Sequence, residues 1–145
     1  MNDKWGRQLF TAGAVLMVLL GLVHALSLIR APVPANETER QLFHLMDTYR
    51  FNLMGSMRSM TDLFRGFSMA FTVASLGLGV LDLTLARERP ALLKRVALVN
   101  IVWLAALVGI ALKYFFAVPL TLQVVALLIF AAAWLKLPSA SPDSI

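Results

Sequence analysis

The chain has 145 residues, of which 59% are hydrophobic and only 14% are charged. Soluble domains carry about 45–50% apolar and about 25% charged residues, so this composition argues against a water-soluble globular fold. Intrinsic disorder is excluded because it requires low hydrophobicity. The absence of cysteine excludes disulfides, thiolate metal sites and a cysteine nucleophile. A net charge of +5 in so apolar a chain indicates orientation in a membrane rather than binding of nucleic acid.

Four apolar segments have the length, or nearly the length, of a membrane-spanning helix, which takes about 20 residues. They cover residues 9–29, 66–85, 96–116 and 120–135. The first is longer than the apolar part of a cleaved signal peptide, about 7–15 residues, so we expect it to be retained. Only residues 117–119 separate the last two segments, which predicts a tight antiparallel hairpin. The fold expected is an all-α integral membrane protein, a four-helix bundle that forms one domain over residues 1–145.

Basic residues indicate how this bundle is oriented. Seven of them flank the ends of spans that are expected on one side of the membrane: Lys4, Arg7, Arg87, Arg89, Lys94, Arg95 and Lys136. Short loops rich in Lys and Arg stay in the cytoplasm. We therefore expect both termini to be cytoplasmic and the protein to lie in a bacterial inner membrane.

The outer connection between the first two spans has a helical pattern. The stretch Thr38 to Gln41 has the spacing of a helix capping box. Apolar residues then recur at steps of three and four: Leu42, Leu45, Met46, Tyr49 and Leu53. This pattern predicts an amphipathic helical segment over about residues 36–60 that lies on the membrane surface or caps the bundle. Asn52 and Gly55 indicate a turn within it, and the box from Ser59 to Asp62 begins the helix of the second span.

A stripe of small, polar or charged residues runs along the second span at alternating steps of four and three. Its members are Thr61, Arg65, Ser68, Thr72, Ser75, Gly79 and Asp82. One interpretation is close packing, because small and hydroxyl residues mark helix interfaces in membranes. The other is a polar path or ligand groove that leads inward from the outer face.

Polar groups from all four spans are expected at similar depth near the outer end. Ionisable groups inside a membrane are costly, so they favour a functional interpretation. We expect His24 to pair with Asp62 as a candidate acid/base pair, because a carboxylate orients a histidine that titrates near neutral pH. The ligand-binding candidates are Arg58, Arg65, Ser68, Trp103, Tyr114 and Gln123. The alternative is a simple ion pair of Asp62 with Arg58 or Arg65 at a wet interface.

Two further groups have chemical interest. Asp82 and Asn100 are expected at equal depth near the inner end, where a hydrogen bond between them would act as a structural latch. The run of Met54, Met57 and Met60 offers thioethers that suit Cu(I), although methionine is also a flexible apolar filler. On a helix these three would diverge by about 60° per step, which disfavours a metal site.

These observations predict a small membrane protein that binds an apolar or amphipathic ligand, such as a lipid, isoprenoid or quinone. The ligand would enter an outward-opening, polar-rimmed pocket, where acid/base chemistry is one interpretation of His24 and Asp62. No cofactor, resident metal or nucleic-acid partner follows from the sequence. One alternative is a non-catalytic assembly subunit that packs against a membrane-complex partner or a second copy. Another is a small transporter or metal-handling protein.

Overall fold

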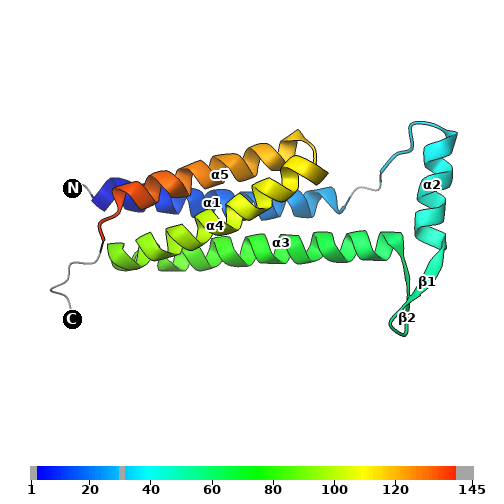
Figure 1. Cartoon of the computed structure of the whole chain (residues 1–145), viewed down its shortest axis with the longest axis horizontal. Coiled ribbons are helices and arrows are strands. Elements are labelled where there is room, and N and C mark those ends of the chain that lie inside the picture. Colours follow the sequence, from blue (N-terminus) through cyan, green and yellow to red (C-terminus); the bar gives the residue numbers. More distant parts are fainter. Residues whose placement is uncertain (1–2, 30–31, 140–145) are drawn as a thin grey trace. The chain divides into compact units, whose positions relative to one another are not determined.

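The computed structural model describes residues 3–29 and 32–139 (Figure 1). Its elements are α1 (Asp3–Ser27), α2 (Glu37–Thr48), β1 (Arg50–Leu53), β2 (Ser56–Ser59), α3 (Met60–Leu85), α4 (Pro90–Tyr114) and α5 (Ala117–Lys136). Helices α1, α3, α4 and α5 are each long and apolar enough to cross a membrane. The prediction of an all-α fold with four long apolar helices packed together, each a candidate membrane span, is therefore confirmed.

The chain divides into two compact units. The bundle unit comprises residues up to Leu20 and from Ser75 onward, and therefore includes parts of α1 and α3 with all of α4 and α5. The hairpin unit comprises Gly21–Ala74, and therefore includes the end of α1, α2, both strands and the first half of α3.

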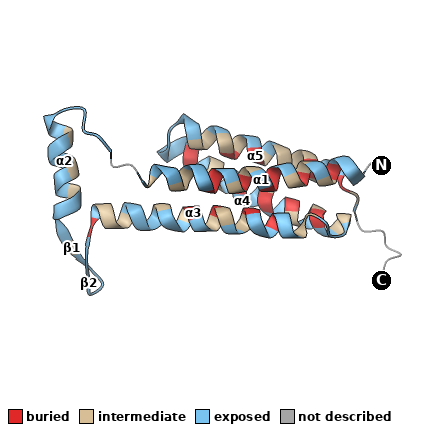
Figure 2. Ribbon diagram, turned by 180° about the vertical axis from the view of Figure 1, so that it is seen from behind, coloured by how far each residue is buried: buried red, intermediate tan, exposed pale blue. Residues whose placement is uncertain are grey.

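Small residues allow the helices of the bundle unit to pack closely. A Cβ added to Gly79 of α3 would lie 2.8 Å from the backbone nitrogen of Val18 on α1. A Cβ added to Gly13 of α1 would lie 2.9 Å from the ring of Phe130 on α5. That ring packs edge-on against Phe10, with centroids 5.6 Å apart. Since lipid supplies little hydrophobic drive between helices, such close approach favours their association through van der Waals packing (buried residues, Figure 2).

The polar stripe of α3 is buried over its second half. Ser75 and Asp82 are both 2% exposed, and Gly79 contacts α1. The close approach at Gly79 is what the packing interpretation predicts for this part of the stripe. In the hairpin unit Thr72 is also buried, but Arg65 is exposed. The expectation that the whole stripe faces inward is therefore wrong at Arg65.

The hairpin of α4 and α5 is as tight as expected, but its helix boundary differs. Helix α4 ends at Tyr114 and α5 begins at Ala117, so Pro119 lies in the first turn of α5 rather than in the loop. A proline is tolerated there because the first N–H groups of a helix have no intrahelical partner. Helices α1 and α3 also begin before their apolar segments. Their first turns contain polar residues, so the apolar pattern alone does not mark where these helices start.

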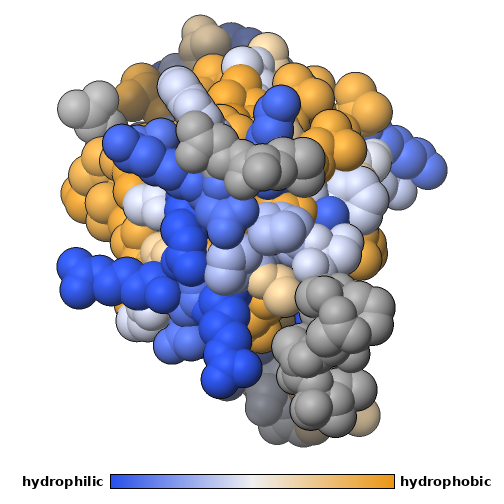
Figure 3. Space-filling view, turned by 90° about the vertical axis from the view of Figure 1, so that its left-hand side faces the viewer, coloured by the Kyte–Doolittle hydropathy of each residue, from blue (hydrophilic) through white to orange (hydrophobic). Residues whose placement is uncertain are grey.

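The basic ends of the bundle helices lie together. Arg7 Nη1 donates to the carbonyl oxygen of Ala86 at 3.3 Å, which joins the start of α1 to the end of α3. Lys94 Nζ donates to the carbonyl oxygen of Leu137 at 2.8 Å, which joins α4 to the end of α5. Carbonyls at helix C-termini lack intrahelical partners, so these bonds satisfy them. Figure 3 shows hydrophilic side chains gathered on this face.

Helix α2 forms within the predicted amphipathic segment, but its cap differs. Asn36 Oδ1 accepts a hydrogen bond from the Glu39 N–H at 2.9 Å, and the Glu39 carboxylate accepts one from the Ala35 N–H at 2.7 Å. The expected box starting at Thr38 is therefore wrong, because Asn36 provides an earlier and strongly preferred N-cap. No residue of α2 is buried.

Residues 50–59 form a β-hairpin, so the prediction of a helical segment up to residue 60 is wrong. Met54 and Gly55 have φ values of 49° and 91°, as a two-residue type I′ turn requires. Asn52 Oδ1 accepts a hydrogen bond from the Gly55 N–H at 2.8 Å, which confirms the predicted turn. Leu53 pairs with Ser56 across this turn. The strands are too short to show a clear alternation of apolar and polar residues, and their apolar residues also fit the three- and four-residue spacing of a helix.

Candidate functional site

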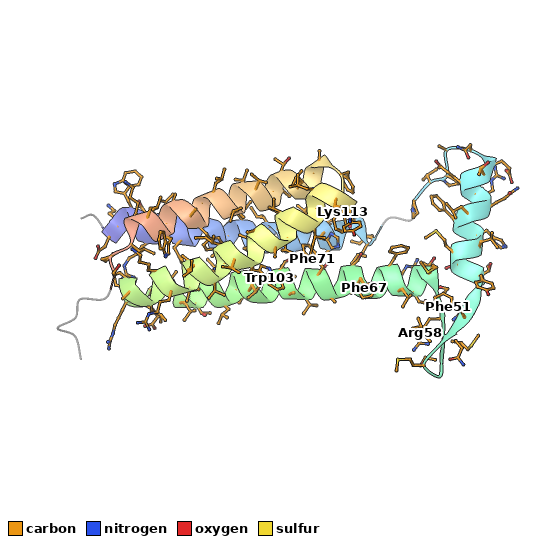
Figure 4. The ribbon with its side chains drawn as sticks, viewed as in Figure 1. Phe51, Arg58, Phe67, Phe71, Trp103 and Lys113 are labelled. Carbon is orange, nitrogen blue, oxygen red and sulfur yellow. The ribbon has the colours of Figure 1, made fainter. Side chains whose placement is uncertain are left out.

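The described part of the hairpin unit contains an open groove with a volume of about 660 Å³. That volume falls within the range of about 300–1,000 Å³ that is typical of ligand sites. The groove is lined by Arg50, Arg58, Asp62, Leu63, Gly66, Phe67 and Ala70. Figure 4 labels two of these residues, Arg58 on β2 and Phe67 on α3. The hairpin and the first turns of α3 therefore form one surface.

Asp62 organises the polar end of the groove. Its Oδ2 accepts a hydrogen bond from the Ser59 N–H at 3.0 Å, while Ser59 Oγ accepts one from the Asp62 N–H at 3.1 Å. This reciprocal pair confirms the capping box predicted at the start of the second span. The same carboxylate oxygen lies 3.5 Å from Arg50 Nη1. Asp62 thus fixes both the start of α3 and the position of one guanidinium.

Arg58 completes the polar end. Its Nη1 donates to the carbonyl oxygen of Met57 at 2.9 Å. Among residues 3–29 and 32–139, Arg58 has no carboxylate within ion-pair distance. The groove is therefore lined by two guanidinium groups and one carboxylate, and its polar end keeps a formal excess of one positive charge. Such an arrangement favours an anionic group.

The other end of the groove is apolar. Leu63, Gly66 and Ala70 follow helical steps of three and four along one face of α3. A Cβ added to Gly66 would meet nothing within 4 Å, so the groove has free space at this position. The neighbouring Phe67 is 72% exposed. From Asp62 to Ala70 the groove follows about 12 Å of helix.

The expected acid/base pair of His24 and Asp62 is not formed. The His24 ring packs edge-on against Phe71, with centroids 4.9 Å apart. Phe71 follows Asp62 by nine residues, or about 14 Å along α3. His24 Nε2 has no hydrogen-bond partner in the part of the chain that the structure describes. The error arises because Asp62 precedes the apolar segment of its helix, whereas His24 lies inside that of α1.

The ion pairs expected for Asp62 also differ. The partner of Asp62 is Arg50, which the sequence did not single out, rather than Arg58 or Arg65. Arg58 belongs to β2 and not to the same helix, so helical spacing does not apply to it. Arg65 is exposed and does not line the groove, and Ser68 is half-buried. Of the predicted ligand-binding residues, the structure brings only Arg58 into the groove together with Asp62.

The expected aromatic wall is not inside the bundle. Trp103 is 42% exposed and Tyr114 is 69% exposed (Trp103, Figure 4). The buried residues of α4 are Leu93, Ala97, Asn100, Leu104 and Ala111. Trp103 precedes Leu104 by one position, which turns its side chain about 100° away from that residue. Neither aromatic residue is buried among the bundle helices, and the ligand-binding role expected for them stays a prediction.

Polar residues inside the bundle unit are mainly structural. Asn100 Nδ2 donates to Asp82 Oδ2 at 2.7 Å, which confirms the predicted latch. Gln123 is buried in α5, and its Oε1 has no hydrogen-bond partner among the described residues. The ligand-binding role expected for Gln123 stays a prediction.

The methionine run does not lie on one helix. Met54 is in the turn, Met57 in β2 and Met60 at the start of α3. All three side chains are exposed. Within residues 3–29 and 32–139, no group of three or more His, Asp and Glu side chains is arranged to hold a metal ion.

Most of the groove was not found from the sequence. Asn52 and Gly55 predict a turn. A hairpin built on this turn pairs Arg50 with Ser59 and so brings Arg50 to Asp62, but the sequence pattern alone predicts a helix here. This strand pairing is the feature from which the contact of Arg50 with Asp62 could have been predicted. Comparison with known protein families, curated proteins and solved structures gives no match for this chain.

Proposed function

We propose that this protein is an integral membrane protein that binds an amphipathic lipid in the groove between α3 and its hairpin. The observation that carries the proposal is the division of the groove into a charged end and an apolar end. Arg50, Arg58 and Asp62 lie at the first, and Leu63 and Ala70 belong to the second. An amphiphile has the same division, and four membrane-length helices bring the chain into contact with lipids.

The binding test uses two glycines of α3. A Cβ at Gly66 or at Gly77 would meet nothing within 4 Å, so both positions have space in which a side chain can begin. Gly66 lines the groove and Gly77 does not. Binding of dioctanoylphosphatidic acid to the purified protein in a nonionic detergent is measured by native mass spectrometry. We expect Gly66→Leu to weaken binding about tenfold by filling the groove, and Gly77→Leu to bind as the wild type does.

Two results would contradict the proposal. The first is absence of specific lipid binding to the wild-type protein. The second is equal binding by the wild type and the Gly66→Leu variant, which would locate the lipid elsewhere. Thermal unfolding of both variants provides the folding control, since a Cβ at either glycine has open space around it.

We also propose that the chain lies in a bacterial inner membrane with both termini in the cytoplasm. The seven basic residues at one end of the bundle helices support this orientation. Because the chain has no cysteine, single-cysteine variants report sidedness directly. Met54→Cys is expected to react with a membrane-impermeant maleimide in intact cells, and Arg89→Cys only after the membrane is opened. The reverse pattern would overturn the orientation.

A further inference from the structure

We infer that the lipid bound in this groove carries a phosphate headgroup, held between Arg50 and Arg58. This inference rests on the proposed function, since it names the headgroup of the same ligand. The proposed ligand is a phosphate joined to an apolar chain, and is neither free phosphate nor an uncharged lipid.

The charges at the polar end favour an anion with more than one accepting oxygen. The Arg50 guanidinium already has a carboxylate at 3.5 Å, that of Asp62. The Arg58 guanidinium has only the Met57 carbonyl oxygen as a hydrogen-bond acceptor in the described ranges. A phosphate offers several oxygens around one centre, so it can accept from both arginines while Asp62 remains paired. A carboxylate has only two oxygens, both in one plane, so it is less suited than a phosphate to bridge two guanidinium groups that approach from different directions.

Asp62 acts here as a positioning residue. Its carboxylate is held by the Ser59 N–H at 3.0 Å and in turn holds Arg50 at the edge of the groove. The hairpin register pairs Arg50 with Ser59 and Phe51 with Arg58, so the two arginines start from opposite strands and opposite faces of the ribbon. They come together where both side chains line the groove. The anion site therefore depends on the hairpin being formed.

The apolar end distinguishes a lipid from free phosphate. The groove continues from the charged residues past Leu63, Gly66 and Ala70, which carry no polar side chain. Phe67 beside them is 72% exposed, and an apolar chain lying in the groove would cover it. Free phosphate would use only the charged end and leave this apolar surface uncovered.

The experiment compares three probes on three forms of the protein in nonionic detergent. The probes are dioctanoylphosphatidic acid, dioctanoylglycerol with the same chains and no phosphate, and inorganic phosphate. The proteins are the wild type, Arg58→Gln and the matched control Arg65→Gln, an exposed arginine of α3 outside the groove. We expect Arg58→Gln to bind phosphatidic acid about tenfold more weakly, because a charge-assisted hydrogen bond is lost. Arg65→Gln should bind it as the wild type does.

The outcomes separate this inference from the proposed function. Equal binding of dioctanoylglycerol and phosphatidic acid by the wild type would overturn the phosphate headgroup and leave lipid binding intact. Equal loss in Arg58→Gln and Arg65→Gln would also overturn it, because the effect would then be general electrostatics. Displacement of the lipid by inorganic phosphate at matched concentration would overturn the requirement for a chain. Failure of the proposed function itself is recognised separately, by unchanged lipid binding in Gly66→Leu.

Discussion

The bundle unit and the hairpin unit use polar residues in opposite ways. In the bundle unit the Asp82 carboxylate is 2% exposed, and an amide from the next helix donates to it at 2.7 Å. In the hairpin unit the side chains of Arg50 and Asp62 are 55% and 39% exposed although they are paired. A polar group that the fold satisfies and buries contributes to helix association. One that remains accessible is available for a ligand, which is why we assign binding to the hairpin unit.

Glycines of α3 show the same contrast. At Gly79 the neighbouring helix leaves no room for a Cβ, whereas at Gly66 the space is open. One glycine is therefore required for packing, and the other leaves room along the groove. This difference can be tested by substitution in each unit.

The largest effect is expected at Gly79. A Leu side chain there would collide with the backbone nitrogen of Val18, which cannot move aside as a flexible side chain can. We expect Gly79→Leu to lower the free energy of unfolding by about 3 kcal/mol, measured by circular dichroism during titration with sodium dodecyl sulfate. Gly77→Leu, on the same helix with open space, should change it by less than about 0.5 kcal/mol. Similar losses in both variants would contradict the close approach of α1 and α3.

The latch comes next. Asn100→Leu removes the only hydrogen-bond donor to Asp82 in the described residues and leaves its carboxyl buried. We expect a loss of about 2 kcal/mol in the free energy of unfolding, measured by the same titration. Replacing both residues by Leu should recover at least half of this loss, because no unpaired polar group remains. If the double variant is less stable than either single variant, the two residues do not act as a pair.

The sequence predicted the bundle unit better than the hairpin unit. For the spans, the length of the apolar segments was sufficient for the prediction. In the bundle unit the contact of Asp82 with Asn100 could also be predicted, because the depth of a residue in a straight membrane helix follows from its position in the sequence. In the hairpin unit this assumption failed. The chain changes from helix to strand after Thr48, and its apolar residues fit both periodicities. Depth along the chain therefore did not place Asp62 at the level of His24.

Local capping signals were more reliable than periodicity in that unit. The reciprocal bonds of Ser59 and Asp62 were predicted, since a capping box depends only on residues three apart. The partner of Asp62 was missed because Arg50 reaches it through strand pairing, which needs a turn to be recognised first. Trp103 lies one step before the buried Leu104, and one step along a helix changes the face on which a side chain lies.

A smaller and local effect is expected at the start of α3. Ser59→Ala removes the Oγ that accepts from the Asp62 N–H, so it should reduce local stability by about 1 kcal/mol. Hydrogen exchange of the first amides of α3 is expected to become faster, by about fivefold. Thr121→Ala is the control, because its hydroxyl donates only to the Ala117 carbonyl oxygen within an exposed turn of α5. An effect of equal size in both variants would show that the box does not fix Asp62.

The smallest effect has the opposite sign and concerns the turn. Met54 holds a φ of 49°, a conformation that Asn adopts more readily than Met, and Asn-Gly is a preferred type I′ sequence. The Met54 side chain is fully exposed, so Asn loses no packing within the protein. We expect Met54→Asn to stabilise the hairpin by about 0.5 kcal/mol, seen as slower exchange of the hairpin amides in detergent.

Met57→Asn is the control for the turn, since Met57 is also exposed but lies in the extended strand β2. It should give no stabilisation. Met54→Asn could instead slow exchange in detergent but accelerate it in lipid nanodiscs. In that case the Met54 side chain contacts the bilayer, and the loss of this contact outweighs the preference of Asn for the left-handed backbone. If exchange is unchanged in both, the left-handed backbone at Met54 does not limit the stability of the hairpin.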